Sequence, residues 1–260
     1  MTSAHSMFVN AKPHASRMRF RNIMLLLMWV SLCGCATRER LCPPQTLASP
    51  YERTQLWAIV PFTNESGTSI VRTDRIADAF TEQAEEVQGI AMVPVNRVLA
   101  AMQQLKMPAV LTPAHAMRLM NVLHVDGLIV GTVTTYDPYP PLKLGAAVQL
   151  YRREFTEAAA SLDAVALTRA RTEHVAPGAI SSQEPAAQAS GVFDASNHQT
   201  LLWLDAYAVG RAEPNSAYGK KVYLVSMEMY TQFVAYRLLH DLLAIERARL
   251  QPETTQPPNG

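Results

Sequence analysis

An apolar run near the N-terminus constrains the fold most strongly, because it separates a leading segment from the part of the chain that can form a domain. Residues 23–32 contain no charge, and three arginines precede them. This order is typical of a secretory signal. A spanning helix needs roughly 20 apolar residues, but only sixteen positions lie between Arg21 and Arg38. We therefore expect a cleaved signal at residues 1–34, with an uncleaved short anchor as the alternative. Met18 is an alternative start of translation.

The end of this run has the pattern of a cleavage and lipidation signal. Leu32, Cys33, Gly34 and Cys35 follow one another and resemble the lipobox of bacterial lipoproteins. The resemblance implies cleavage between Gly34 and Cys35 and acylation of the Cys35 thiol, so the protein would contact the membrane through the lipid on Cys35. Buried acyl chains contribute about 0.8 kcal/mol per methylene. Ala36, rather than Asp, at the next position implies the outer membrane, with the domain facing the periplasm.

The remaining residues, 35–260, have an ordinary globular composition. The whole chain is 48% hydrophobic and 17% charged, with a net charge of +1. Such a charge does not favour nucleic-acid binding, which usually shows a basic footprint. Once Cys33 leaves with the signal and Cys35 is acylated, Cys42 is the only free thiol. An intrachain disulfide is then impossible, and a Cys/His zinc site would lack ligands.

Short apolar runs alternate with helical patterns, which predicts a single α/β domain at residues 55–250. We expect a mixed sheet of about four to five strands with packed helices, entered through a proline-containing tether at residues 35–54. A flexible insertion is expected at residues 157–191, where residues 163–167 could form a strand, and a disordered tail at residues 251–260. The expected strands are residues 56–62, 90–93, 128–134, 144–150 and, as a short last strand, 192–194.

Capping residues place the helices. Thr112 followed by Pro113 is a helix start, Thr73 or Asp74 can cap an earlier helix, and Asn96 is expected to cap the one between them. Ser196 or Asn197 would begin a segment over residues 201–208 that is helical or, alternatively, extended. The strongest helical pattern covers residues 219–249 and predicts a long C-terminal helix over the core, with Lys220, Glu228, Gln232, Arg237 and Glu246 in solvent.

The order of these elements resembles the envelope lipoproteins of the curli-secretion (CsgG-type) superfamily, the peptidoglycan-synthase activator lipoproteins and the N-terminal domain of TolB. The resemblance covers residues 56–151, somewhat under half of the chain. It implies a protein-binding or assembly role. The matching stretches are hydrophobic patterns and indicate no particular catalytic chemistry. Strands long enough to form a membrane pore are not expected. The matching stretches are Ala58-Ile59-Val60-Pro61-Phe62-Thr63-Asn64 and Val125-Asp126-Gly127-Leu128-Ile129-Val130-Gly131-Thr132-Val133.

Catalytic and cofactor motifs are missing from the sequence. It has no G-x-S-x-G, P-loop, G-x-G-x-x-G or H-E-x-x-H pattern. His115 and His124 are nine residues apart, so they do not share a helical face. Asp194, His198 and Asp205 are close in sequence and are a candidate metal or acid/base site, which we do not favour. We therefore expect no enzyme activity, no cofactor and no metal.

The turn at residues 136–141 is the best candidate for binding a partner. Tyr136 and Tyr139 are held among prolines, including Pro140 and Pro141, and rigid aromatic residues are common interface anchors; the alternative is that they only cover the end of the sheet. The leading hypothesis is a non-catalytic module that binds another envelope protein in secretion, wall synthesis or complex assembly. The alternatives are a ring or collar of identical subunits, joined through the last helix and its Met- and Tyr-rich face, and an unrecognised enzyme.

Overall fold

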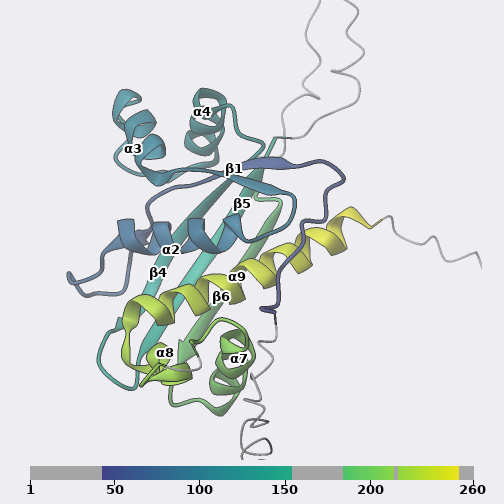
Figure 1. Ribbon diagram of the computed structural model, residues 1–260. Coiled ribbons are helices and arrows are strands. Elements are labelled where there is room, and N and C mark those ends of the chain that lie inside the picture. The colour runs from purple at the N-terminus through teal and green to yellow at the C-terminus, as the bar shows by residue number, and fades with distance from the viewer. Residues whose placement is uncertain (1–42, 154–183, 214–215, 252–260) are drawn as a thin grey trace, which may run out of the picture. The chain divides into compact units, whose positions relative to one another are not determined.

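Six strands form one mixed sheet in the order β3-β1-β4-β5-β6, with the short β2 paired to β4. The computed structural model describes residues 43–153, 184–213 and 216–251 (Figure 1). The chain divides into two units after Leu41, and the first unit lies outside the described residues. The strands are β1 (Gln55–Ile59), β2 (Thr63–Asn64), β3 (Ile90–Val93), β4 (Gly127–Asp137), β5 (Lys143–Arg152) and β6 (Ala187–Asp194).

The helices complete the expected α/β fold. They are α2 (Thr73–Glu85), α3 (Val95–Gln104), α4 (Pro113–Leu123), α7 (His198–Ala208), the 3-10 turn η1 (Gly219–Lys221), α8 (Val222–Val225) and α9 (Met227–Leu250). None of the helices within the described ranges combines the length and apolarity that crossing a membrane requires.

The first half of the sheet is parallel and the second half is antiparallel. β1 pairs in parallel with both β3 and β4, and helices provide the crossovers between them. β4 and β5 form a long hairpin, and β6 pairs antiparallel with β5. Gly131 of β4 lies under Phe62, so that a Cβ at this position would be 2.3 Å from the ring. The last strand is longer than the predicted residues 192–194, because small side chains such as Ala187 and Ala189 also fit against the core.

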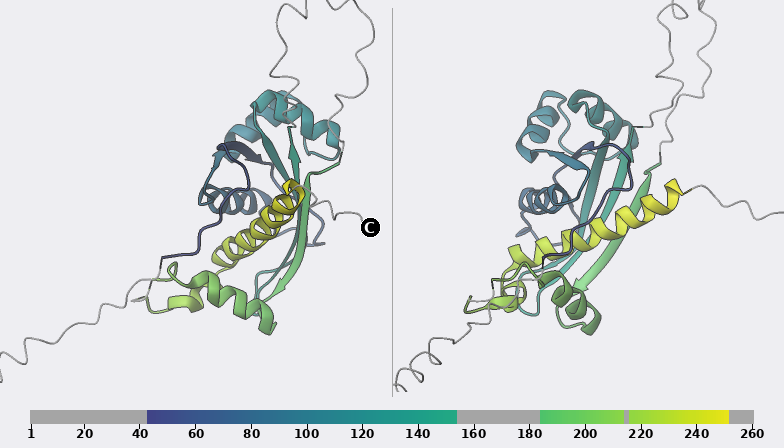
Figure 2. Two further views of the ribbon diagram at one scale, coloured as in Figure 1. Left: turned by 90° about the vertical axis from the view of Figure 1, so that its right-hand side faces the viewer. Right: turned by 45° about the vertical axis from the view of Figure 1, so that its right-hand side comes forward.

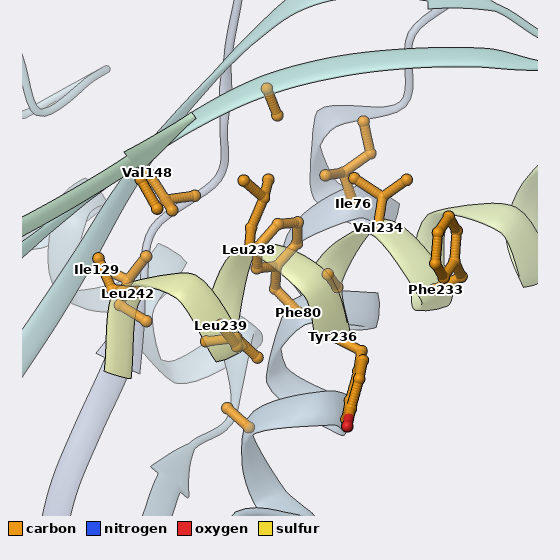
Figure 3. Close-up of a cluster of buried hydrophobic side chains, with 14 of the residues drawn as sticks. Ile76, Phe80, Ile129, Val148, Phe233, Val234, Tyr236, Leu238, Leu239 and Leu242 are labelled. Atoms are coloured by element: carbon orange, nitrogen blue, oxygen red, sulfur yellow. The ribbon is translucent and has the colours of Figure 1, made fainter. Parts of the chain in front are cut away.

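Helices α2 and α9 cover one face of the sheet and enclose the main core (Figures 1 and 3). Phe80 of α2, Leu238 of α9 and Val148 of β5 are among the buried side chains of this core (Figure 3). On the opposite face, α3 and α4 pack against β1 and the start of β4 in a second, smaller cluster. Tyr230 and Tyr236 of α9 are buried in the domain's own core, so most of the face that could have joined identical subunits is already covered.

Four local predictions were wrong. Helix α2 begins at Thr73, with Arg72 rather than Thr73 or Asp74 at the N-cap position and no side-chain cap. Helix α3 begins at Val95, with Pro94 rather than Asn96 at the N-cap position. The pattern at residues 219–249 is not one helix, because Ser226 has extended backbone and caps α9 by accepting a hydrogen bond from the Met229 N–H. Glu246 was expected in solvent but is fully buried, because arginines on both sides neutralise its charge. The Thr112 cap and a helix capped by Asn197 were confirmed.

The chain enters the domain along a strap, residues 45–53, which is bonded to Gln88, just before the edge strand β3, and to helix α9. The Ser49 N–H donates to the Gln88 carbonyl at 2.9 Å, and the Gln88 N–H donates to the Leu47 carbonyl at 2.9 Å. Arg247 of α9 donates to the Ala48 carbonyl at 3.0 Å. Only the part of the predicted tether before Gln45 can therefore separate the domain from an anchor. Cys35, Cys42 and nearly all of the expected insertion and tail lie outside the described residues.

Candidate functional site

A groove with a cavity volume of about 480 Å³ lies between α2 and the first turns of α9. Tyr136, near the end of β4, also lines it. The end of β4 lies at the same end of the sheet as the first turns of α9 (Figure 1). We call this cavity the α2–α9 groove. Ile76, Ala79 and Met227 supply apolar lining, and Thr231 and Gln232 supply polar groups. The full lining is Arg72, Arg75, Ile76, Asp78, Ala79, Glu82, Tyr136, Met227, Glu228, Thr231 and Gln232.

Charges of both signs surround the groove. Arg75 on α2 is exposed, and Glu82 and Glu228 provide negative charge. The Gln232 side chain donates to Glu82 at 3.0 Å, which joins α9 to α2 across the groove. Burial raises the pKa of Tyr136, so its hydroxyl stays neutral at physiological pH. A lining that mixes apolar side chains, charges of both signs and one neutral phenol suits a polypeptide segment, whereas acid–base chemistry requires titratable groups held together.

The turn beside the groove contains the other residues predicted to bind a partner. Tyr139 is 73% exposed, and its N–H donates to Asp137 Oδ1 at 3.1 Å. Pro140 and Pro141 are also exposed. Tyr136 therefore lines the groove, while Tyr139 projects from the turn that follows it. The sequence identified the turn but not the groove, because residues distant in the chain on α2 and α9 form its other walls.

A second polar cluster surrounds the buried Glu246 carboxylate near the end of α9. Tyr51 donates to Glu246 Oε1 at 2.8 Å, Arg152 donates to the same oxygen at 3.0 Å, and Arg249 donates to both oxygens at 2.7 and 2.8 Å. Burial acts to raise the pKa of Glu246, but the hydrogen bonds from Arg249 and Tyr51 outweigh it and hold the pKa below its ordinary value. The Arg152 guanidinium also stacks on the Tyr51 ring at 4.1 Å. The cluster fastens the strap to α9 and β5.

The acidic residues considered as a site do not come together. Asp194 accepts from the Ser196 hydroxyl and N–H at 2.6 and 2.8 Å and pairs with Lys143 at 3.0 Å, which lowers its pKa to about 2. His198 is exposed at the start of α7, and Asp205 lies 4.0 Å from Lys220. The Asp194 contacts shape the turn that leads into α7, and the Asp205–Lys220 pair joins α7 to η1.

The two histidines of α4 have local roles. His115 lies in the first turn, where its N–H donates to the Thr112 hydroxyl at 3.2 Å. His124 ends the helix in the left-handed conformation, with φ of 55°. Across residues 43–153, 184–213 and 216–251, no three His, Cys, Asp or Glu side chains are grouped to hold a metal ion.

No family model and no curated protein matches the chain. Solved structures with similar folds include the C-terminal domain of LpoB from Salmonella enterica, with a TM-score of 0.32 and 12% identity over 38% of this chain and 73% of that one. Lipoprotein GNA1162 from Neisseria meningitidis has a TM-score of 0.37 and 16% identity over 58% and 94%. The hypothetical protein CT253 from Chlamydia trachomatis has a TM-score of 0.31 and 9% identity over 75% and 95%. At these TM-scores, the likeness carries no inference about function.

Proposed function

We propose that the chain is a lipid-anchored, non-catalytic module of the bacterial cell envelope that binds a segment of another envelope protein in the α2–α9 groove. The observation that carries the proposal is the groove itself, which combines apolar side chains, charges of both signs and Tyr136 beside a turn with an exposed tyrosine. Such composition is that of a protein interface, with aromatic anchors inside a polar rim. The proposed relation to curli-secretion and peptidoglycan-synthase activator lipoproteins agrees with such a role.

Site-specific photo-crosslinking in cells tests this binding site. With p-benzoylphenylalanine in place of Tyr139, we expect crosslinking to one envelope protein. The same probe in place of Val122, which is exposed on α4, serves as the control. Arg75→Glu, inside the groove, should weaken the crosslink about fivefold or more, the effect of a contact worth about 1 kcal/mol. Arg97→Glu, an exposed position on α3 outside the groove, should not.

The outcomes separate the alternatives. Equal crosslinking from the Tyr139 and Val122 positions, or the same loss with Arg75→Glu and Arg97→Glu, would refute the groove as the binding site. A crosslink from the Tyr139 position to a second copy of this chain would instead support a homo-oligomer and refute a foreign partner.

The anchor has its own test. Cys35→Ser removes the thiol that would accept the lipid and leaves the fold intact, because Cys35 precedes the strap by ten residues. The mutant should remain as an uncut precursor or be released as soluble protein, while Cys42→Ser should behave like the wild type. Mass spectrometry of the membrane fraction measures the difference. A mature N-terminus elsewhere than Cys35, or an unmodified Cys35 in the wild type, would contradict the proposed anchor.

A further inference from the structure

The strap begins beside α7 and α8, at one end of the domain. Arg211, just after α7, donates to the Gln45 carbonyl at 3.0 Å and pairs with Glu86 at 2.9 Å. Its guanidinium also lies over the Tyr207 ring, 4.5 Å from the centroid, which holds the arginine in place for its hydrogen bond to Gln45. In all three views, the described chain begins close to α7 and α8 (Figures 1 and 2). The path from any anchor therefore reaches the domain at these helices.

Helix α7 buries one side in the core and exposes several apolar side chains on the other. Leu204, Tyr207 and Ala208 point into the core. On the outward side, Leu202 is 48% exposed and Ala206 and Asp205 are exposed, and Val209, whose extended backbone ends the helix, is 39% exposed. Exposed apolar side chains that gather beside polar ones mark sites of contact with proteins or membranes, so the outward side of α7 is a candidate contact surface.

The surface continues onto the segment that follows α7. Tyr218 and Val225 are exposed there, and Lys220 of η1 lies 4.0 Å from Asp205 of α7, which places η1 beside the outward face. Lys221 is exposed as well. Aliphatic side chains bordered by an aromatic residue and lysines match the membrane interface, where apolar groups enter the acyl boundary and lysines meet lipid headgroups.

We propose that this α7–α8 surface, made of Leu202, Val209, Tyr218, Val225 and the two lysines of η1, rests on the lipid bilayer to which the protein is anchored. The inference rests on the proposed lipid at Cys35. Gln45 lies ten positions after Cys35, and such a segment spans at most about 35 Å when fully extended and roughly 18 Å when flexible. The α7–α8 surface, which lies where the strap begins, is therefore held within reach of the headgroups.

Trp203 of α7 is a built-in reporter of this contact. It is 37% exposed, beside Leu202 on the helix, whereas Trp57 is fully buried, and the third tryptophan, Trp29, belongs to the predicted signal. The full mature lipoprotein is reconstituted into phosphatidylcholine–phosphatidylglycerol vesicles with and without doxyl-labelled phosphatidylcholine. We expect the label to reduce the Trp203 emission roughly twofold, because interfacial aromatic rings lie at headgroup depth.

Matched surface variants show whether the contact is specific. Leu202→Ser with Val209→Ser should restore at least half of the quenched emission. Leu111→Ser with Val122→Ser, two exposed apolar residues in the α4 region, should leave the quenching unchanged. Unquenched wild-type emission, or equal effects of the two double variants, would overturn the docking. The wild-type measurement does not depend on the folding of any variant. The mass of the N-terminal peptide in the same preparation tests the anchor, so the two proposals fail separately.

Discussion

Replacing Glu246 by Gln removes a buried negative charge while keeping the size of the side chain. The carboxylate is fully buried and accepts hydrogen bonds from Tyr51, Arg152 and Arg249. Removing one partner of a buried ion pair usually costs about 3–5 kcal/mol. Arg249 is more than one-third exposed and can recover hydration, so we expect a loss of about 2–4 kcal/mol in the free energy of unfolding, or roughly 5–15 °C in Tm for a domain of this size.

Equilibrium denaturation followed by circular dichroism measures this loss. The matched control is Asp241→Asn on the same helix, which also changes a carboxylate that pairs with an arginine, Arg237 at 2.8 Å. Asp241 is more than one-third exposed, so the control should cost about 0.3–0.5 kcal/mol, as other i,i+4 pairs do. A loss below about 1 kcal/mol for Glu246→Gln, or equal losses for both variants, would refute the role that we assign to the buried cluster.

The pH dependence of the same variant follows from the lowered pKa of Glu246. Its ordinary value is 4.5 and its folded value is lower, so the unfolded chain binds the proton more tightly. The stabilisation is therefore fully present above about pH 4.5 and is lost as the pH falls through the folded pKa. The difference between wild type and Glu246→Gln should shrink below pH 4.5, and a constant difference across this range would contradict the assigned ionisation.

Three further changes have defined outcomes. Gly131→Ala places a Cβ 2.3 Å from the Phe62 ring and should lower the free energy of unfolding by about 1–3 kcal/mol in a denaturant titration; no change would show that the ring moves freely. Asn197→Ala removes the side-chain cap of α7 and should cost about 1 kcal/mol by the same measurement. The Asp194 carboxyl should titrate by NMR near its pKa of about 2, and Ser196→Ala should raise this pKa because it removes the hydroxyl donor; an unchanged pKa would exclude that cause.

The sequence predicted the elements whose cause is local. The run at residues 128–134 and the Thr112 cap carry their own hydrophobic and capping signals, so β4 and α4 were identified correctly. The expected sheet of about four to five strands lacked only the two-residue β2. The break at Ser226 was missed because Val225 and Met227 continue the apolar pattern on both sides of it.

The candidate site was less predictable because its parts come together only in the tertiary structure. The turn with Tyr136 and Tyr139 was visible from its aromatic and proline residues. The groove residues on α2 lie more than fifty positions before the turn and those on α9 more than eighty positions after it, and nothing in their local sequence indicates a shared groove. The burial of Glu246 was equally hidden, because its partner Tyr51 lies 195 residues earlier in the chain.

The contacts of the strap determine which part of the domain bears a pulling force on the chain first. A pull on the chain from its N-terminal side first reaches the contact of Gln45 with Arg211, then the bonds of residues 47–49 with Gln88, and then the Tyr51 hydroxyl on Glu246. These attachments lie in series ahead of β1, so each must rupture before the central sheet bears tension. The strap is therefore the first part of the domain to detach: tension from the N-terminal side would separate it from α9 while the groove between α2 and α9 keeps its shape.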